Sequence, residues 1–484
     1  MRRTLQAASG PAIPVIRMDN ETAAPAAATA ANRRPASTHA GWLLRSPGAD
    51  SAPQSRSAAL TPAGLRALLF AAYVALIAIR IPGVLSGRLW AEDGFFLVDA
   101  IRLPWWQALL QPHTGYLDIV ASGTMVLAAR LVALEDAPLV SLTLSLCIQA
   151  LPGLILATGG IRSMRNPWYL AGALLILATL PLAEEVWLSP ITSQYHLIVA
   201  VALVLAAEPA RGWTRRLHRM VLLLAPFAGP GPSLLLPLFV LRAMRECCWE
   251  RVGQALAISL GTLVQMAVLL SHPVAQRDFG LAPDLLLVVV AIKHILVPML
   301  FRPETIALAN PLMRAWLDNP WSAWPLLAMA GSIGVLTVFG AAAWHSRSQA
   351  ASWLFAAAVV TMVLSYAGSL GPKDALLGIL FGQRYYAAPQ MLFGLTLIAI
   401  ASAASLPGRL LAGGFAVWLI AIGIAGFGPP DPMMANGPDW REQVAAWRSD
   451  PGHRLALWPS NFTIALPAAP ARADAQLALA TANQ

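Results

Sequence analysis

Residues 322–343 read SAWPLLAMAGSIGVLTVFGAAA and contain no aspartate, glutamate, lysine or arginine. As an α-helix, this run is long enough to cross the ~30 Å hydrocarbon core of a bilayer at ~1.5 Å per residue. The hydrocarbon core offers no hydrogen-bond partners to backbone N–H and C=O groups, so such a run must be helical. The stretch therefore predicts a membrane-spanning helix.

Comparable apolar runs recur along the chain. The whole sequence is 57% hydrophobic and only 12% charged, well below the roughly 25% charge of soluble domains. The composition predicts an all-α, polytopic integral membrane protein with about 10–12 transmembrane or re-entrant helices. The predicted runs are 64–85, 117–134, 138–160, 167–183, 195–208, 217–241, 255–271, 285–301, 322–343, 351–368, 388–406 and 410–427.

The N-terminal part of the chain divides into a tail and a membrane domain. Residues 1–60 are rich in Ala, Pro, Ser and Thr, and we expect this tail to be disordered and cytoplasmic. Residues 61–427 hold the transmembrane helices, together with a mixed loop at 86–116 that is too polar to span. Arginines before the first run hold the N-terminus in the cytoplasm, which predicts that this loop lies on the outer face.

The C-terminal residues 428–484 form a short polar segment. Trp440, Val444 and Trp447 are spaced to share one face of a helix, and residues 453–467 have the pattern of a short extended stretch. We expect this segment on the outer face.

Strict alternation of the predicted spans conflicts with the positions of the arginines. The arginines within 162–165 and 211–219 look cytoplasmic, yet two predicted spans lie between the outer loop and residue 162. At least one run must therefore be broken or re-entrant. The candidate breaks are 152–153 and 226–232, because Pro and Gly interrupt membrane helices where protein buries the freed backbone.

The net charge of +9 comes largely from arginines in short connections and in the N-terminal tail. The positive-inside rule accounts for that distribution, so we expect membrane lipids as partners and no nucleic acid. The sequence has no phosphate-binding glycine loop, dinucleotide fingerprint or HExxH motif. Its cysteines and histidines do not match a zinc-site spacing. We therefore expect neither a cofactor nor a metal.

The leading candidate for chemistry is the segment RLWAEDGFF at residues 88–96. It places Glu92 and Asp93 side by side just past the first predicted span, flanked by aromatic residues. A carboxylate can accept a proton from an attacking hydroxyl, and such general-base help is worth roughly 10²–10⁴ in rate. The alternative is that Asp93 caps the following helix while Glu92 is solvated.

Further polar residues at the ends of predicted spans are candidates for substrate binding. They are His113 with Tyr116, Glu184 and Glu185 with Gln194 and His196, and Lys373 with Arg384 and Tyr385. Arg88, in the acidic motif, is another, while Lys293 and His294 lie inside an apolar run where ionisable groups are functional by default. The alternatives are solvated helix ends, an interfacial turn, and an aromatic belt with snorkelling cations.

A short N-terminal span, followed by a surface loop that opens with an acidic pair and runs through an amphipathic helix, resembles the membrane-integral glycosyltransferases of the GT-C fold. More narrowly, the chain resembles a group of bacterial membrane proteins with a Trp-Ala-Glu-Asp-Gly first outer loop. The motifs that carry this narrower resemblance are Trp90–Gly94 after the first span, Gly115–Leu117, Gly229–Pro232 and Arg384–Tyr386. The resemblance implies a GT-C-like helical domain in the bacterial inner membrane and a polyprenyl-phosphate sugar as donor.

The resemblance also implies roles for particular residues. Asp93 would be the general base, with Glu92 as its neighbour or alternative, and Arg384 and Lys373 would hold the lipid phosphate. The sugar would pass to a lipid or glycan acceptor on the outer face. The alternative function is a multi-pass transporter, or a lipid or glycan flippase, without catalytic activity. Coupled transporters usually carry carboxylates inside their spans, whereas most acids here lie at span ends, which favours the enzyme.

Overall fold

The computed structural model describes residues 61–81, 88–274, 279–280, 282–427 and 437–467. The predicted disordered tail at 1–60 lies outside these residues, as do the last residues of the predicted C-terminal segment. All described residues belong to one compact unit of the chain.

Helices make up most of the described residues, and the named strands among them form one small antiparallel sheet, which pairs β1 (Leu455–Ala456) with β2 (Thr463–Ile464). Six of the helical stretches are long and apolar enough to cross a membrane. This confirms the predicted all-α, polytopic membrane protein. The six are Leu134–Ala157, α11 (Trp249–Ser271), α15 (Ala323–His345), α16 (Gln349–Ala367), α17 (Gln383–Ala403) and α18 (Leu406–Ala425).

The other helices are shorter or more polar. The shorter apolar ones are α1 (Pro62–Ala78), α4 (Ile119–Leu131), α7 (Pro167–Ala178) and α8 (Ser193–Ala206). The rest are α2 (Asp93–Arg102), α3 (Trp105–Leu110), α5 (Ala137–Gln149), α6 (Leu151–Ala157), α9 (Gly212–Leu224), α10 (Leu236–Glu246), α12 (Pro283–Val290), α13 (Val297–Met299), α14 (Arg302–Asp318) and α20 (Trp440–Ser449). Single turns of 3₁₀ helix cover 134–136, 162–164, 184–186, 225–228, 231–235 and 373–377, and a π-helical turn covers 291–296.

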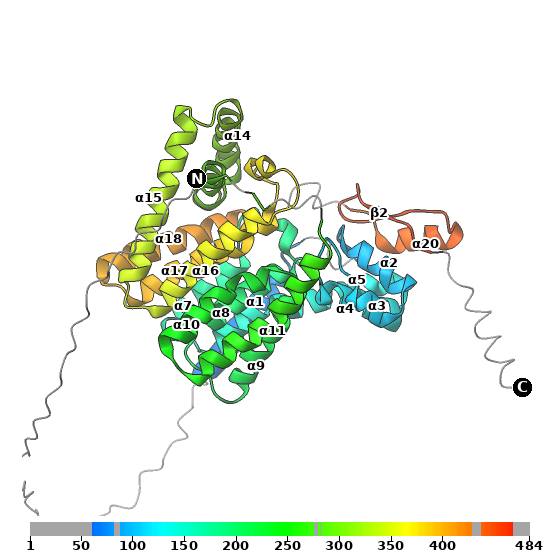
Figure 1. Ribbon diagram of the computed structural model, residues 1–484, viewed down its shortest axis with the longest axis horizontal. Helices are drawn as coiled ribbons and strands as arrows, with labels where there is room; N and C mark the ends of the chain where they lie inside the picture. The colour runs from blue at the N-terminus through cyan, green and yellow to red at the C-terminus, as the bar shows by residue number, and fades with distance from the viewer. Residues whose placement is uncertain (1–60, 82–87, 275–278, 281, 428–436, 468–484) are drawn as a thin grey trace, which may run out of the picture. The chain divides into compact units, whose positions relative to one another are not determined.

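The centre of the bundle is formed by α8 and α17. Every residue of α8 is buried, and α17 is buried over most of its length. Figure 1 shows α16, α17 and α18 side by side, and α8 packs against both α16 and α17. From Leu197 onward α8 is apolar on all sides, which is typical of a helix surrounded by protein or lipid.

Polar contacts divide the bundle into two ends. We call one the basic end, where Arg66 near the start of α1 donates to the carbonyl of Arg165 at 3.0 Å. The other is the loop end, where Arg80 after α1 donates to the carbonyl of Leu180 at 2.6 Å. The loop end contains residues 88–118, 180–192 and 368–384, and α1 connects the two ends.

The predicted span 117–134 does not cross the bundle, because α4 starts and ends among loop-end residues. At its start, Asp118 lies within electrostatic range of Asp93. Near its end, Arg130 donates to the carbonyl of Leu103 at 3.1 Å, just past α2. With α4 returning to the loop end, α5 and α6 make the single crossing to residues 162–165. This resolves the conflict between the alternating spans and the arginines.

The predicted span 217–241 is broken, as its Pro-Gly motif indicated. Gly229 has a φ of 131°, which favours glycine, and it separates the two short 3₁₀ turns between α9 and α10. The tip at Gly229 contacts the side chain of Gln194 in the first turn of α8. Both outer ends of the hairpin lie at the basic end, where Arg219 pairs with Glu250 at 2.9 Å. The hairpin is therefore re-entrant.

At the other predicted break, Pro152-Gly153, the helix is interrupted at one residue, because α5 ends at Gln149 and α6 begins at Leu151. Together, Leu134–Ala157 still form one apolar helical stretch of 24 residues, long enough to cross a membrane. Pro152 lies in the first turn of α6, where a missing N–H costs little. Gly153 instead allows close packing, because a Cβ there would overlap the ring of Tyr73 in α1.

The predicted span 285–301 also stays at the loop end. Before it, Phe279 lies against Gly368 at the end of α16, and Lys293 in its middle donates to the carbonyl of Gly378 at 2.7 Å. After it, Phe301 lines a cavity together with Leu182. The helix α14 that follows falls outside the predicted runs, because its sequence is only weakly apolar.

The C-terminal segment packs on the first loop rather than standing apart. Trp458 donates its N–H to the carbonyl of Leu89 at 3.0 Å, and Ala91 donates to the carbonyl of Trp458 at 2.6 Å. Figure 1 shows α20 and β2 beside α2. In α20, Trp440 and Val444 are buried, as their predicted shared face requires.

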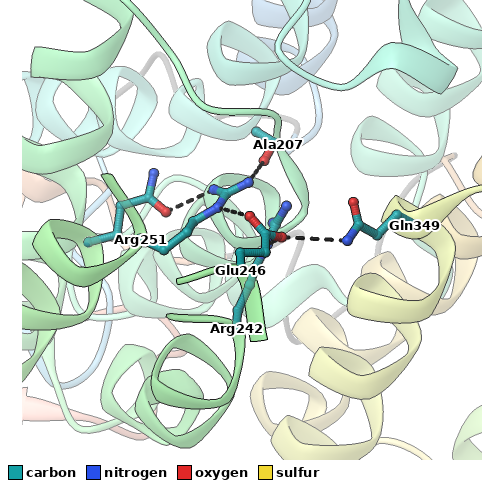
Figure 2. Close-up of polar contacts among 6 residues, drawn as sticks. Ala207, Arg242, Glu246, Arg251 and Gln349 are labelled. Carbon is teal, nitrogen blue, oxygen red and sulfur yellow. Dashed lines mark hydrogen bonds and ion pairs between the residues drawn. The ribbon is translucent and has the colours of Figure 1, made fainter. Parts of the chain in front are cut away.

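A polar clamp holds the re-entrant hairpin at the basic end (Figure 2). Arg251 is 1% exposed and donates to Glu246 at 2.6 Å, to Gln254 at 2.9 Å and to the carbonyl of Ala207 at 2.9 Å. Glu246 also accepts from Arg242 at 2.6 Å. A buried guanidinium is stable only with such partners. The clamp therefore joins the end of α8 to the α10–α11 connection.

We predict that Glu246→Gln lowers the free energy of unfolding by about 3 kcal/mol, because it leaves two buried guanidinium groups without a carboxylate. The matched control Glu250→Gln affects arginines whose side chains are nearly half exposed, and we expect a loss of about 1 kcal/mol or less. Unfolding of the purified protein in mixed detergent and dodecyl sulfate would compare them. Equal losses in the two variants would contradict the role of the clamp.

Candidate active site

Asp93 is the most deeply buried acid of the predicted motif. Its side chain is 0% exposed and accepts hydrogen bonds from the Ser189 hydroxyl at 3.0 and 3.2 Å and from the backbone of Ile191. It makes no cap contact on α2, so the helix-cap alternative does not describe its geometry. Burial raises the pKa of Asp93 to about 7, although Ser189 opposes the shift.

Asp118 is a second buried carboxylate beside Asp93 that the sequence analysis missed. One of its oxygens accepts from the backbone N–H of Ala121 at 2.9 Å and caps α4. Its Oδ2 atom is buried and has no hydrogen-bond partner among the described residues. Burial, together with the charge of Asp93, raises the pKa of Asp118 well above its ordinary value. The only signal in the sequence was an acid immediately after the Gly115–Leu117 motif.

Arg88 supplies positive charge close to Asp93. It is 4% exposed and donates to the carbonyl of Trp187 at 2.8 Å. Its guanidinium lies 5.1 Å from the ring centroid of Trp90 and 5.7 Å from that of Trp458. Burial lowers the pKa of Arg88 to about 10, and the nearby Asp93 opposes that shift. Arg88 therefore stays cationic at neutral pH.

Arg384 joins two of the predicted acidic groups. Its Nη1 lies 3.0 Å from Glu92 Oε1, and its Nε lies 3.1 Å from Glu185 Oε1. The Arg384 and Glu92 side chains are each 27% exposed, whereas that of Glu185 is 13% exposed. Burial raises the pKa of Glu185, and Arg384 opposes this. Three predicted residues from separate loops thus meet in one cluster.

Neighbouring polar side chains complete this cluster. Gln383 donates to Glu184 at 3.0 Å and accepts from the backbone N–H of Glu185 at 2.8 Å. Tyr116 hydrogen-bonds with Gln194. Tyr385 accepts from a backbone N–H of the 370–382 loop at 3.1 Å. The first loop, the α7–α8 loop and the start of α17 therefore share one polar site.

Three predicted binding residues lie elsewhere. Lys373 donates to the carbonyls of Ala367 at 2.9 Å and Ser369 at 2.7 Å, so its ammonium restrains the end of α16. His196 is buried against the ring of Trp187, with 5.0 Å between the ring centroids. His113 Nε2 lies 3.0 Å from Oδ2 of Asp99 in α2, and both side chains line a groove separate from this site.

Lys293 lies beside the site. The sequence pointed to this residue but not to a particular role for it. Its ammonium donates to the carbonyls of Gly378 and Ile379 at 2.7 Å and of Phe381 at 3.0 Å. These carbonyls immediately precede Arg384 in the chain. Lys293 therefore fixes the loop that delivers Arg384. The sequence feature that pointed to Lys293 was a lysine inside an apolar run.

A cavity of about 260 Å³ opens beside Glu184. Its walls come from 181–184, 297–303 and 422–426 and are mostly apolar, with Glu184 and Arg302 as the charged side chains. Among the described residues, no group of three His, Cys, Asp or Glu side chains is placed to hold a metal ion.

Comparison with known proteins gives no match. Neither a family model, nor a curated protein, nor a solved structure matches the chain. The function must therefore be inferred from the chemistry of the site. That chemistry is a buried carboxylic acid that can take up or release a proton near neutral pH, next to a partly exposed arginine held between two acids.

We predict that Asp93 makes the protein less stable as the pH rises. Because its folded-state pKa is about 7, above the unfolded value, the native state binds more protons between pH 4 and 7, and stability falls through that window. Relative to wild type, Asp93→Asn should gain at most about 3 kcal/mol of stability between pH 5 and pH 8, because about two pH units of that window lie above pH 5.

Apparent Tm values in detergent at pH 5 and pH 8 would measure this difference. Asp374→Asn, which changes an exposed carboxylate at the same end, serves as the control and should leave the pH dependence unaltered. If Asp93→Asn and wild type lose stability in parallel between pH 5 and 8, the raised pKa is wrong.

Proposed function

We propose that the protein is a membrane glycosyltransferase that moves a sugar from a polyprenyl-phosphate donor to a lipid or glycan acceptor. The reaction takes place at the loop end, on the outer face of the bacterial inner membrane. The observation that carries the proposal is Asp93, a buried carboxylate with a pKa of about 7. A general base is most effective when its pKa lies near the working pH.

In this reaction Asp93 accepts the proton of the acceptor hydroxyl. The hydroxyl oxygen forms a bond to the anomeric carbon of the donor sugar, and the bond from that carbon to the phosphate oxygen breaks. The phosphate leaves with the electron pair, and the proton stays on Asp93 until it is released to solvent. Ser189 holds the carboxylate in one orientation, and Arg88 supplies a nearby positive charge.

Arg384 stabilises the leaving phosphate. Its Nε forms an ion pair with the more buried Glu185, while its Nη1 donates a hydrogen bond to Glu92 at the partly exposed edge. The donor phosphate replaces Glu92 at that edge, because a guanidinium binds phosphate through parallel hydrogen bonds. The apolar cavity beside Glu184 offers a site for part of the isoprenoid chain.

One observation favours a second candidate, a proton-coupled transporter. Asp93 and Asp118 are two buried carboxylates in electrostatic contact, and both pKa values are raised. Such a pair can exchange protons, as the carboxylates of coupled transporters do. A transporter would move its substrate without any glycosidic bond being formed, so the two functions differ in their products.

Asp93→Asn is expected to abolish sugar transfer, because the amide keeps the size of the side chain but cannot accept a proton. Asp93→Glu should lose about 100-fold, since displacement of the carboxylate by about 1 Å is enough for that. The assay is incorporation of labelled sugar from a polyprenyl-phosphate donor into membrane or surface glycan, with protein abundance measured by immunoblot.

Asp374→Asn, an exposed carboxylate at the same end, is the matched control and should transfer sugar normally. A fully active Asp93→Asn protein would rule out the base mechanism. Net uptake of substrate without a new glycosidic bond would support the transporter instead.

Arg384→Lys is expected to lose most activity, because an ammonium cannot keep the fixed geometry of a guanidinium towards both a carboxylate and a phosphate. We expect a fall of at least about tenfold in kcat/KM for the donor. Arg409→Lys, at an exposed position in the first turn of α18, is the control. Normal turnover by Arg384→Lys would show that a positive charge alone is enough there and would remove the phosphate role.

A further inference from the structure

A groove of about 450 Å³ lies between α2 and the C-terminal hairpin, outside the site described above. Its walls come from two parts of the chain that are far apart in sequence. The polar and aromatic side chains that line it are Phe95, Asp99, Arg102, His113, Arg454 and Thr463. The C-terminal segment therefore forms a surface that neither part could build alone.

The charges in this groove are unevenly matched. Asp99 Oδ2 lies 3.0 Å from His113 Nε2, so the acid already has a partner. Arg454 donates to the Thr463 hydroxyl at 3.1 Å, and Arg102 lies in the last turn of α2. Both arginines are exposed, and neither forms an ion pair within the described part of the chain. The groove thus offers two guanidinium groups to an anion.

The remaining side chains favour a carbohydrate over a simple anion. The Asp99 carboxylate can accept hydrogen bonds from hydroxyls, and the Thr463 hydroxyl can donate to them. Phe95 is 48% exposed and presents an apolar ring on which the C–H face of a sugar can pack. Arginine binds a carboxylate through two parallel hydrogen bonds.

The groove is also correctly placed to serve Asp93. Both lie on α2, and Asp99 follows Asp93 by six residues, which is about 1.7 helical turns and about 9 Å at 1.5 Å per residue. A short oligosaccharide is long enough to cover this distance. His113 packs on Phe96 with 4.0 Å between the ring centroids, which fixes the wall of the groove to the same helix.

We propose that this groove binds the acceptor, and that the acceptor is an anionic oligosaccharide whose carboxylates lie against Arg102 and Arg454. This rests on the proposed function, since it names the acceptor class of that enzyme. Its own test measures binding without turnover, so it can fail while sugar transfer is retained.

The probe is tetragalacturonate, and its fully methyl-esterified form is the neutral match. Binding to the purified full-length protein is measured by calorimetry. We expect the acid to bind at least tenfold more tightly than the ester, and Arg102→Gln/Arg454→Gln to lose at least tenfold for the acid alone. Arg448→Gln, an exposed arginine of α20 paired with Glu135, is the control and should bind as wild type does.

Three outcomes would overturn the proposal. The first is equal binding of the acid and the ester, and the second is unchanged binding by the double variant. The third is displacement of tetragalacturonate by inorganic phosphate at similar concentrations, which would indicate a general anion site. Asp93→Asn should bind the probe normally, so a failure of the proposed base does not alter this measurement.

Discussion

One guanidinium holds three distant parts of the chain together at the loop end. Arg384 begins α17, Glu92 begins α2, and Glu185 lies between α7 and α8. A charge without a partner costs several kcal/mol where little water reaches, so the two ion pairs favour the arrangement in which these three parts of the chain meet. The loops carry the acids of the site, and their mutual pairing sets where Asp93 can lie.

The two lysines of the chain act on the same region by a different means. Lys293 and Lys373 each direct the ammonium at backbone carbonyls, before Arg384 and at the end of α16 respectively. Carbonyls at helix ends and in loops have no intrahelical partner. A cation among them satisfies several at once and limits the movement of 370–382. The segment that presents Arg384 is therefore restrained from both sides.

The positions of the helices could be predicted from the sequence, but their depth could not. An apolar run shows that a segment avoids water, and it does not distinguish a crossing from a return. For α4 and for 283–299 the decision depends on contacts such as Arg130 with Leu103. Asp93 could be predicted from its motif. Asp118 and the groove depend on tertiary contacts that no local pattern records.

The packing of the C-terminal segment on the first loop has a consequence for biosynthesis. Trp90 and Trp458 form a backbone bridge although 368 positions separate them. At translation rates of roughly 5–20 residues per second, the first loop waits about 20–70 s for its partner. During that time Leu89 and Phe96 lack the cover they have in the finished protein. Until residues 437–467 are synthesised, the chain therefore displays part of an apolar surface that the C-terminal segment later covers.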